Sequence, residues 1–364
     1  MLMAITKLPI NEFLSLAKTS LVLDVRSPGE FLQAHIPGAH NISLFTDEER
    51  KVVGTAYKQQ SKQAAIKIGL SYFGVKLLQM VEAVEEIIKT NSSVQQTDAT
   101  VVLVHCWRGG MRSAGVAWLL DLYGYKVYTL IGGYKAYRNW VLAQFEKVYP
   151  MAILGGYTGS GKTEVLHALA KQGANIIDLE GLAHHKGSAF GAFGQPEQPS
   201  QEYFENKLAL VLSELAEKIT MEPNGTSKNI IWIEDESQRI GNRTIPTIFF
   251  QQMRKKQVYF LNIPFDERLN FIDAQYGQFE KTALVNAVIR IKKRLGGLET
   301  KNSVNYLIED QTKEAFRILL HYYDRVYSKA LSNNRDETIA VIKVEATEVN
   351  PTQNAALLLA NYKS

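Results

Sequence analysis

The chain has 364 residues, of which 46% are hydrophobic and 21% charged, and its formal net charge is +4 at neutral pH. This length predicts two or three domains of a soluble globular protein, and the small positive charge permits an anionic partner without requiring one. No apolar run reaches the roughly 18–20 residues of a membrane span, and the single cysteine excludes an intramolecular disulfide, so we expect a cytoplasmic protein without membrane contacts.

Residues 1–144 alternate short apolar runs with amphipathic stretches. This alternation predicts an α/β domain with a mostly parallel sheet. The predicted strands are residues 21–25, 101–105 and 126–130, and the predicted helices are residues 76–90, 113–124 and 135–150.

A second α/β pattern occupies residues 145–364, and its sequence beyond residue 265 is mostly helical. We therefore predict a second α/β domain with a largely helical C-terminal part. The predicted strands are residues 151–156, 175–180, 230–236, 257–263 and 338–344, and the predicted helices before residue 265 are 163–172, 203–219 and 248–256.

The stretch "GYTGSGKT" satisfies the P-loop pattern G-x-x-x-x-G-K-[ST], and it lies between a predicted strand and a predicted helix. In such a loop, backbone N–H groups and a helix N-terminus surround phosphate oxygens, Lys162 adds a positive charge, and Thr163 can ligate Mg²⁺. ATP or GTP is the usual ligand, but any diphosphate would satisfy the same donors. The predicted diphosphate-binding residues are Gly156, Thr158, Gly159, Ser160, Gly161, Lys162 and Thr163.

Acidic residues follow a later strand of the same domain, where P-loop proteins commonly place a residue that orders a metal. These are Glu234, Asp235 and Glu236, which would order a metal or the substrate, or would be solvated charges at a strand end. A loop at residues 184–191 contains two adjacent histidines but no cysteine or spaced carboxylate to complete a metal site. We expect this loop to contact phosphate or substrate, and we assign no metal site.

The only cysteine lies in the stretch "VHCWRGGMRS", between a predicted strand and a predicted helix. Backbone N–H groups of a glycine-rich loop can converge on one point, and with nearby arginines they would stabilise a thiolate and bind an oxyanion. Cys106 is then a nucleophile or the carrier of a transferred atom, whereas the alternative is a small buried hydrophobe. The predicted oxyanion-binding residues are Arg108, Gly109, Gly110 and Arg112.

Two kinds of enzyme use such a loop. The spacing from Cys106 to Arg112 matches the Cys-x5-Arg pattern of cysteine phosphatases, whereas the loop of rhodaneses is usually one residue shorter. The stretch "LDVRSPGEFLQAHIPGAHNI" at residues 23–42 nevertheless resembles the N-terminal rhodanese motif, and "LIGGYKAYRNW" at residues 130–140 resembles the closing rhodanese segment. Residues 1–144 are therefore identified as a rhodanese-like domain, followed by a P-loop domain over residues 145–364.

Over nearly its whole length the chain resembles the tRNA 2-selenouridine synthases. The resemblance rests on "HCWRGGMRS", "GGYTGSGKT", "HHKGSAFG", "QPSQEYFEN" and "IEDESQRIG", which occur in this order. It implies a transferase that acts on the wobble 2-thiouridine of tRNAs reading Lys, Glu and Gln codons. Such an enzyme transfers a geranyl group from geranyl diphosphate to the sulfur, and then replaces that sulfur with selenium from selenophosphate.

The resemblance also implies roles for the two loops. Cys106 would carry the selenium while the arginines of its loop hold the selenophosphate, and the P-loop would hold the diphosphate of geranyl diphosphate. No cofactor would be tightly bound, and an enzyme that makes selenophosphate would be a partner. The aromatic stretches "AFGAFG" at residues 189–194 and "TIFFQQM" at residues 247–253 are candidates for a prenyl pocket.

A basic cluster is the candidate tRNA-binding surface, because RNA binding needs contacts to phosphates. It comprises Arg290, Lys292, Lys293 and Arg294, and the alternative is a solvated helix face. Two other functions are also compatible with the motifs. One is an ATP-dependent sulfurtransferase acting through a Cys106 persulfide, and the other is a nucleotide-dependent regulatory module with a degenerate phosphatase-like domain.

Overall fold

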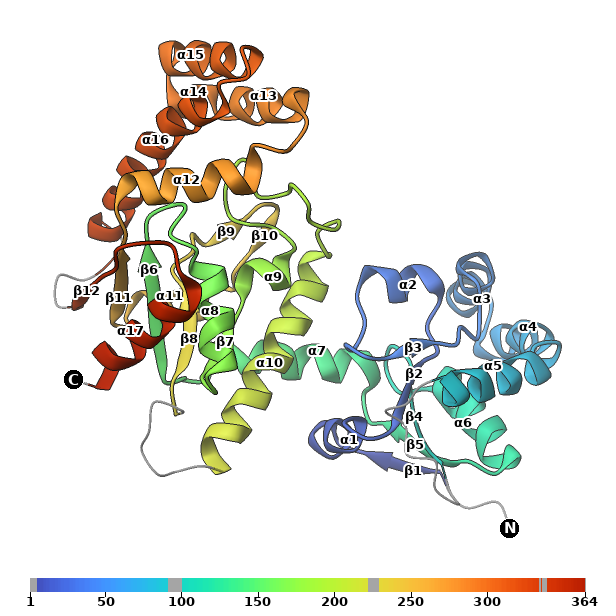
Figure 1. The fold of residues 1–364 in the computed structure, drawn as a ribbon. Coiled ribbons are helices and arrows are strands. Elements are labelled where there is room, and N and C mark those ends of the chain that lie inside the picture. The colour runs from blue at the N-terminus through green and yellow to red at the C-terminus, as the bar shows by residue number, and fades with distance from the viewer. Residues whose placement is uncertain (1–4, 91–99, 222–228, 334, 336–338, 364) are drawn as a thin grey trace. The chain divides into compact units, whose positions relative to one another are not determined.

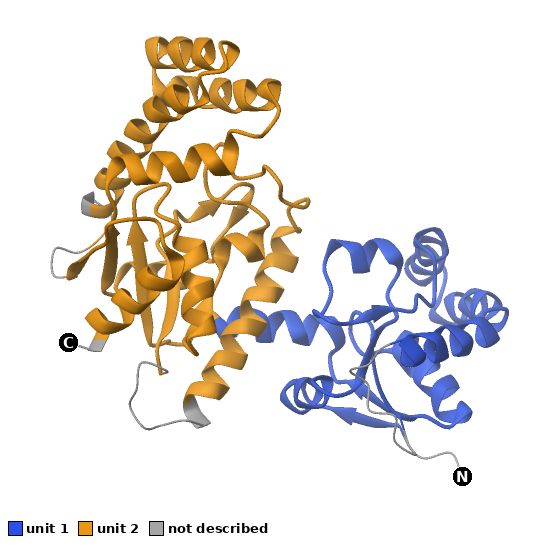
Figure 2. Ribbon diagram, in the orientation of Figure 1, with its two compact units in different colours: residues 1–144 blue, residues 145–364 orange. Residues whose placement is uncertain are grey.

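The computed structural model describes residues 5–90, 100–221, 229–333, 335 and 339–363. The chain forms two compact units, Met1–Gln144 and Phe145–Ser364 (Figure 2). Each unit contains a five-stranded parallel sheet and a hydrophobic core of its own. The predicted α/β class is therefore confirmed for both parts of the chain.

The sheet of the first unit has the strand order β1-β5-β4-β2-β3. Its central strands, β2 (Leu21–Asp24) and β4 (Val101–His105), are almost wholly buried and apolar, as expected for parallel strands covered on both faces. The other strands are β1 (Thr6–Leu8), β3 (His40–Asn41) and β5 (Lys126–Leu130). The helices are α1 (Ile10–Ala17), α2 (Pro28–Gln33), α3 (Asp47–Gln59), α4 (Lys62–Gly74), α5 (Leu77–Thr90), α6 (Met111–Tyr123) and α7 (Gly133–Gln144).

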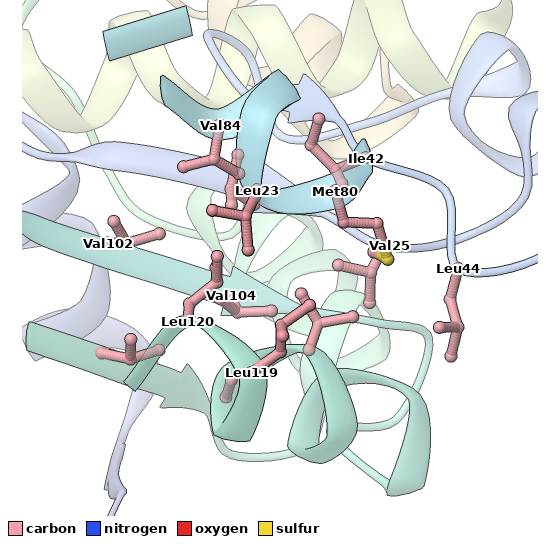
Figure 3. Close-up of a cluster of buried hydrophobic side chains, with 14 of the residues drawn as sticks. Leu23, Val25, Ile42, Leu44, Met80, Val84, Val102, Val104, Leu119 and Leu120 are labelled. Carbon is pink, nitrogen blue, oxygen red and sulfur yellow. The ribbon is translucent and has the colours of Figure 1, made fainter. Parts of the chain in front are cut away.

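Alternate residues of β2 and β4 point to one face of this sheet, where they meet side chains of α5 and α6 (Figure 3). In this core, Leu23 and Val104 come from the strands, and Val84 and Leu120 come from the helices. Cys106 belongs to the same cluster. The loop that contains Cys106 and follows β4 therefore begins in a tightly packed part of the domain.

The sheet of the second unit has the strand order β12-β11-β6-β8-β7, and all its pairings are parallel. Its strands are β6 (Met151–Gly156), β7 (Asn175–Ile177), β8 (Ile231–Glu234), β11 (Val258–Asn262) and β12 (Val341–Glu345), and a small antiparallel pair is formed by β9 (Arg239–Ile240) and β10 (Arg243–Thr244). The helices around it are α8 (Lys162–Lys171), α9 (Leu179–Ala183), α10 (Gln201–Met221), α11 (Thr247–Arg254) and α17 (Pro351–Lys363).

The predicted helical part of this unit forms a separate group of helices (Figure 1). It comprises α12 (Phe265–Tyr276), α13 (Lys281–Arg290), α14 (Lys292–Leu295), α15 (Gly297–Ile308) and α16 (Thr312–Asn333). These helices enclose their own hydrophobic core, which also takes in Phe190 from the loop after α9. That loop is thereby fixed between the sheet and the helical part.

All the predicted strands are present, and three of them have the predicted bounds: residues 101–105, 126–130 and 151–156. The strand predicted at 175–180 is shorter, because Asp178 caps α9 by accepting a hydrogen bond from the Gly181 N–H (2.7 Å). The helix predicted at 135–150 ends at Gln144. The strand predicted at 338–344 appears as β12, and Thr338 lies outside the described residues.

Within the described ranges, no single helix is long and apolar enough to cross a membrane. Helices α4 and α5 together have the length and composition of a span, but they are bent by 59° relative to each other.

Candidate functional site

The cysteine loop connects the end of β4 to the start of α6. Gly109 has a φ of 64°, and a Cβ atom there would lie 2.4 Å from the Leu130 carbonyl oxygen. Gly133 packs equally closely, because its Cβ would lie 2.3 Å from the Cys106 carbonyl oxygen. Both positions require glycine, so the tight wrapping of the loop around the cysteine follows directly from the sequence.

The sulfur of Cys106 is buried. Its Sγ lies 3.3 Å from the Ser113 hydroxyl oxygen, and this hydroxyl also lies within hydrogen-bond distance of the Gly110 carbonyl oxygen (3.1 Å). Burial is the largest single influence and raises the pKa of the thiol. Hydrogen bonds from the Ser113 side chain and N–H, the charge of Arg112 and the N–H of Arg108 act in the opposite direction, and together they hold the pKa below its usual value. These contacts favour the thiolate, and the role of Cys106 as a nucleophile or carrier stays a prediction.

The two loop arginines are placed differently. Arg112 donates a hydrogen bond to Glu30 from α2 (2.8 Å), and Arg50 forms an ion pair with the same carboxylate (2.8 Å). The side chain of Arg108 is exposed. Arg112 is therefore oriented by Glu30, whose role the sequence analysis missed, whereas Arg108 remains accessible to an incoming anion.

Residues of the rhodanese motif form a buried layer beneath the loop. The Arg26 guanidinium bonds Asp24 (Nε to Oδ2, 2.9 Å) and stacks on the Tyr134 ring at 3.8 Å from its centroid. Burial lowers the pKa of the neighbouring His105, so its ring is neutral at pH 7. Both charges of the ion pair are fully buried and mutually satisfied, which indicates a supporting role rather than a catalytic one.

The P-loop joins β6 to α8, as its motif predicts. Gly159 and Gly161 have φ values of 82° and 68°, and a Cβ atom on Gly159 would lie 2.8 Å from the Arg268 carbonyl oxygen. The Lys162 ammonium donates a hydrogen bond to the Gly156 carbonyl oxygen (3.0 Å). The Ser160 hydroxyl is buried and has no hydrogen-bond partner in the described part of the chain. A phosphate oxygen in the loop would satisfy this hydroxyl.

Carboxylates from neighbouring strand ends surround the start of α8. The Thr163 hydroxyl donates to Glu180 (2.7 Å), whose own N–H donates to Glu234 (2.9 Å). Burial and the charge of Glu180 raise the pKa of Glu236 to about 8. For Glu234, burial raises the pKa well above its usual value. Sequence analysis missed Glu180, because it lies in a short helix where a strand was expected.

Asp235 is not available to a metal, contrary to one of our sequence-based expectations. Its buried carboxylate pairs with Arg335 (2.6 Å) and Arg254 (3.0 Å) and accepts a hydrogen bond from Tyr327 (2.7 Å). These partners hold its pKa below the usual range, although burial acts in the opposite direction. The Tyr327 hydroxyl also accepts the Gly156 N–H (3.3 Å). Asp235 therefore anchors α16 beside the P-loop.

The remaining acidic residues do not form a closed metal site, but they could ligate a hard cation such as Mg²⁺. No group of three or more histidine, cysteine or acidic side chains in the described ranges is arranged to hold a metal ion. Oxygen atoms of Thr163 and Glu180 nevertheless lie at the loop, and one oxygen of Glu234 is buried without a partner among those residues. Mg²⁺ on a diphosphate needs only one or two such protein ligands, so these residues fit it.

The histidine loop, residues 184–191, lies close to one of the acids. A Cβ atom on Gly187 would be 2.7 Å from a carboxylate oxygen of Glu236.

In the two aromatic stretches proposed for a prenyl pocket, Phe190 is buried in the helical core and Phe249 packs against Tyr149, so these two rings are not available to a ligand. Phe193 and Phe250 are only partly buried and stay candidates.

The four residues of the basic cluster lie on α13 and α14, and all of them are exposed. Arg290 donates to the Ala189 carbonyl oxygen at 3.4 Å, which links α13 to the histidine loop. The cluster is therefore accessible to an anionic partner. A solvated helix face that binds no partner would be equally exposed.

Comparisons with known proteins support both domain assignments. A family model described as the tRNA 2-selenouridine synthase AAA domain matches residues 149–356, and a rhodanese-like domain model matches residues 10–139. The chain is 34% identical over 311 residues to a tRNA 2-selenouridine synthase of Nitrosomonas europaea, covering 83% of this chain and 74% of that protein. Proteins of the same name from Hydrogenovibrio crunogenus and Shewanella pealeana are 34% and 31% identical, covering 84% and 93% of this chain and 88% and 96% of theirs.

Proposed function

The chain belongs to the tRNA 2-selenouridine synthase family, and from that premise we propose that it converts wobble 2-thiouridine to 2-selenouridine through a geranylated intermediate. The observation that supports this most is the presence of two anion-binding loops on one chain. One surrounds a cysteine whose thiol pKa is lowered, and the other is a P-loop with an unsatisfied buried hydroxyl. The substrates are tRNAs of the Lys, Glu and Gln type.

In the first step, the thiocarbonyl sulfur attacks C1 of geranyl diphosphate, and diphosphate leaves with the electron pair of the broken C–O bond. Negative charge develops on the departing oxygen, where P-loop N–H groups and Lys162 stabilise it. Mg²⁺ held by Thr163 and Glu180 would further neutralise the diphosphate. Alkylation makes the sulfur a much better leaving group, which prepares the base for the second step.

In the second step, the selenium of selenophosphate attacks C2 of the base, and the geranylthiolate leaves with the electron pair of the broken C–S bond. Water then cleaves the P–Se bond, and phosphate is released. Selenium is already at the selenide level in selenophosphate, so the exchange requires no oxidant. We place selenophosphate at the cysteine loop, where Arg108 and the loop N–H groups would bind its oxygens. Cys106 would then lie beside the selenium and take part in its transfer. An enzyme that makes selenophosphate is the expected upstream partner.

The experiment that tests this function supplies the purified protein with 2-thiouridine tRNA and geranyl diphosphate, and then with selenophosphate. Mass spectrometry of the nucleosides is expected to detect the geranylated base first and the selenated base afterwards. Rapid ATP turnover with neither modified base would instead favour the ATP-dependent sulfurtransferase.

A further inference from the structure

A tryptophan is exposed immediately after the cysteine of the first unit. The side chain of Trp107 is 38% exposed, whereas aromatic rings generally contribute their large area to a core. Its indole meets the buried Tyr134 ring, with the two ring centroids 5.7 Å apart, and the buried Arg26 guanidinium carbon lies 5.9 Å from the indole centroid. Buried residues therefore hold this ring while part of its surface stays open to solvent.

The backbone on both sides of the indole is also fixed. The Cys106 carbonyl oxygen accepts a hydrogen bond from the Tyr134 N–H (2.8 Å). The Trp107 carbonyl oxygen accepts one from the Lys135 N–H (3.0 Å). The next N–H group, that of Arg108, favours the Cys106 thiolate by hydrogen bonding. A ring held in this way, on the residue that follows the cysteine, can position a substrate at the cysteine loop with little loss of conformational entropy.

Positive charges lie around this ring. The side chains of Arg108 and Lys135 are exposed and form no ion pair or hydrogen bond within the described ranges. Arg112 and Arg50 share the Glu30 carboxylate, with each contact at 2.8 Å, so these three groups together carry one net positive charge. The phosphates that flank a nucleotide would therefore be attracted to this loop.

We propose that Trp107 stacks the target base of the tRNA and thereby brings its C2 atom to the cysteine loop. The inference rests on the proposed function, because it takes the wobble uridine as the substrate of this loop. An unpaired base of an anticodon loop presents a flat π-face, which aromatic side chains hold by stacking. A purely apolar surface would suit a protein partner, whereas the unpaired cations beside this ring favour a nucleotide with its phosphates.

The test is a binding cycle with two anticodon stem-loops, one carrying 2-thiouridine at the wobble position and one lacking the base there. The wild-type protein is expected to bind the first more tightly by about tenfold or more, which is the contribution of a stacked base. Trp107→Ala should lose most of this difference, because the base then has no ring to stack on. Trp107→Phe should retain most of it. Trp118→Ala, at an exposed position about two turns along α6, is the matched control and should behave as the wild type.

Two further measurements separate stacking from support of the loop. With a stem-loop that already carries the geranyl group, Trp107→Ala should raise the KM for selenation by a factor similar to its loss of affinity. The pH profile of Cys106 alkylation by iodoacetamide should stay that of the wild type. If the profile of Trp107→Ala changed, Trp107→Leu would decide, because its apolar side chain still packs against Tyr134 but offers no ring to the base.

Several outcomes would overturn the inference. An unchanged preference of Trp107→Ala for the stem-loop with the base would remove the base from the ring, and equal weakening of both stem-loops would reduce Trp107 to a structural role. Weakening confined to a geranylated stem-loop would assign the ring to the geranyl group. A wild-type protein that binds the stem-loops but forms no geranylated or selenated base would contradict the proposed function, whereas the binding cycle would still decide whether the base stacks.

Discussion

The single cysteine of the chain owes its expected reactivity to its immediate neighbours. Ser113 approaches the sulfur with a hydroxyl and an N–H group, and both favour the thiolate over the thiol. Arg112 adds a positive charge whose position is set by Glu30. Ser113 and Arg112 lie in the first turn of α6, and Glu30 lies in α2.

Removing the Ser113 hydroxyl should make Cys106 less acidic. Ser113→Ala is expected to raise the pKa of the thiol, because a hydrogen bond to the thiolate is lost while burial remains. The pH profile of iodoacetamide alkylation should shift to higher pH, and Ser113→Thr should restore it. An unchanged profile in the alanine variant would show that the other donors suffice.

The acids beside the P-loop should make stability depend on pH. The pKa of Glu236 is about 4.5 in the unfolded chain but is raised by burial to about 8 in the folded protein, so the folded state binds more protons between these pH values. The free energy of unfolding should therefore fall as pH rises from about 4.5 to about 8. Urea unfolding across this range should show a smaller fall in Glu236→Gln, and equal slopes for the two proteins would contradict the assignment.

At the scale of secondary structure, strand β8 is tied to helix α16 and the segment that follows it. Asp235 at the end of β8 bonds Tyr327 of α16 and pairs with Arg335 beyond it. Tyr327 in turn meets the P-loop at Gly156. The helical part of the second unit is thereby connected to the loop that would hold the diphosphate.

Breaking this connection should destabilise the second unit. Asp235→Ala leaves the buried charges of Arg254 and Arg335 without their shared partner, which should lower the free energy of unfolding by about 3 kcal/mol or more. Asp266→Ala removes an exposed ion pair with Arg317 and should cost about 1 kcal/mol or less. Equal effects of the two substitutions in urea unfolding would show that Asp235 is not an anchor.

Helices α13 and α14 present the basic cluster to solvent, and tRNA binding tests their role. Arg294→Ala should weaken tRNA binding and reduce the slope of log K against log salt by about 1, because one phosphate contact is lost. Lys171→Ala, at an exposed position on α8, serves as the control. An unchanged slope for Arg294→Ala would leave the cluster as a solvated helix face.

Local motifs predicted the two loops well, because each loop is contiguous in sequence and its glycines are required by close contacts, as at Gly109 and Gly159. The longer parallel strands were predictable from their apolar runs, but the short edge strands β1 and β3 were not predicted. Partners distant in sequence were not, since nothing in the sequence pairs Asp235 with Arg335 or Arg268 with Asp324. Glu180 was missed because one capping residue, Asp178, turns an expected strand into a helix.

For the whole molecule, the two loops belong to different units, and each loop is complete within its own unit. Cys106 lies in the hydrophobic core of the first unit, whereas Lys162 belongs to the second unit. We therefore propose that geranylation takes place in the second unit and selenium transfer in the first. The two reactions should be separable by mutation.

This separation is tested most directly by nucleoside mass spectrometry of tRNA treated with Cys106→Ala and Lys162→Ala variants in the presence of geranyl diphosphate and selenophosphate. Cys106→Ala should accumulate the geranylated base and form no selenated base. Lys162→Ala should form neither from 2-thiouridine, yet it should selenate tRNA that already carries the geranyl group. Loss of geranylation in a folded Cys106→Ala variant, or normal geranylation by Lys162→Ala, would contradict this division of labour.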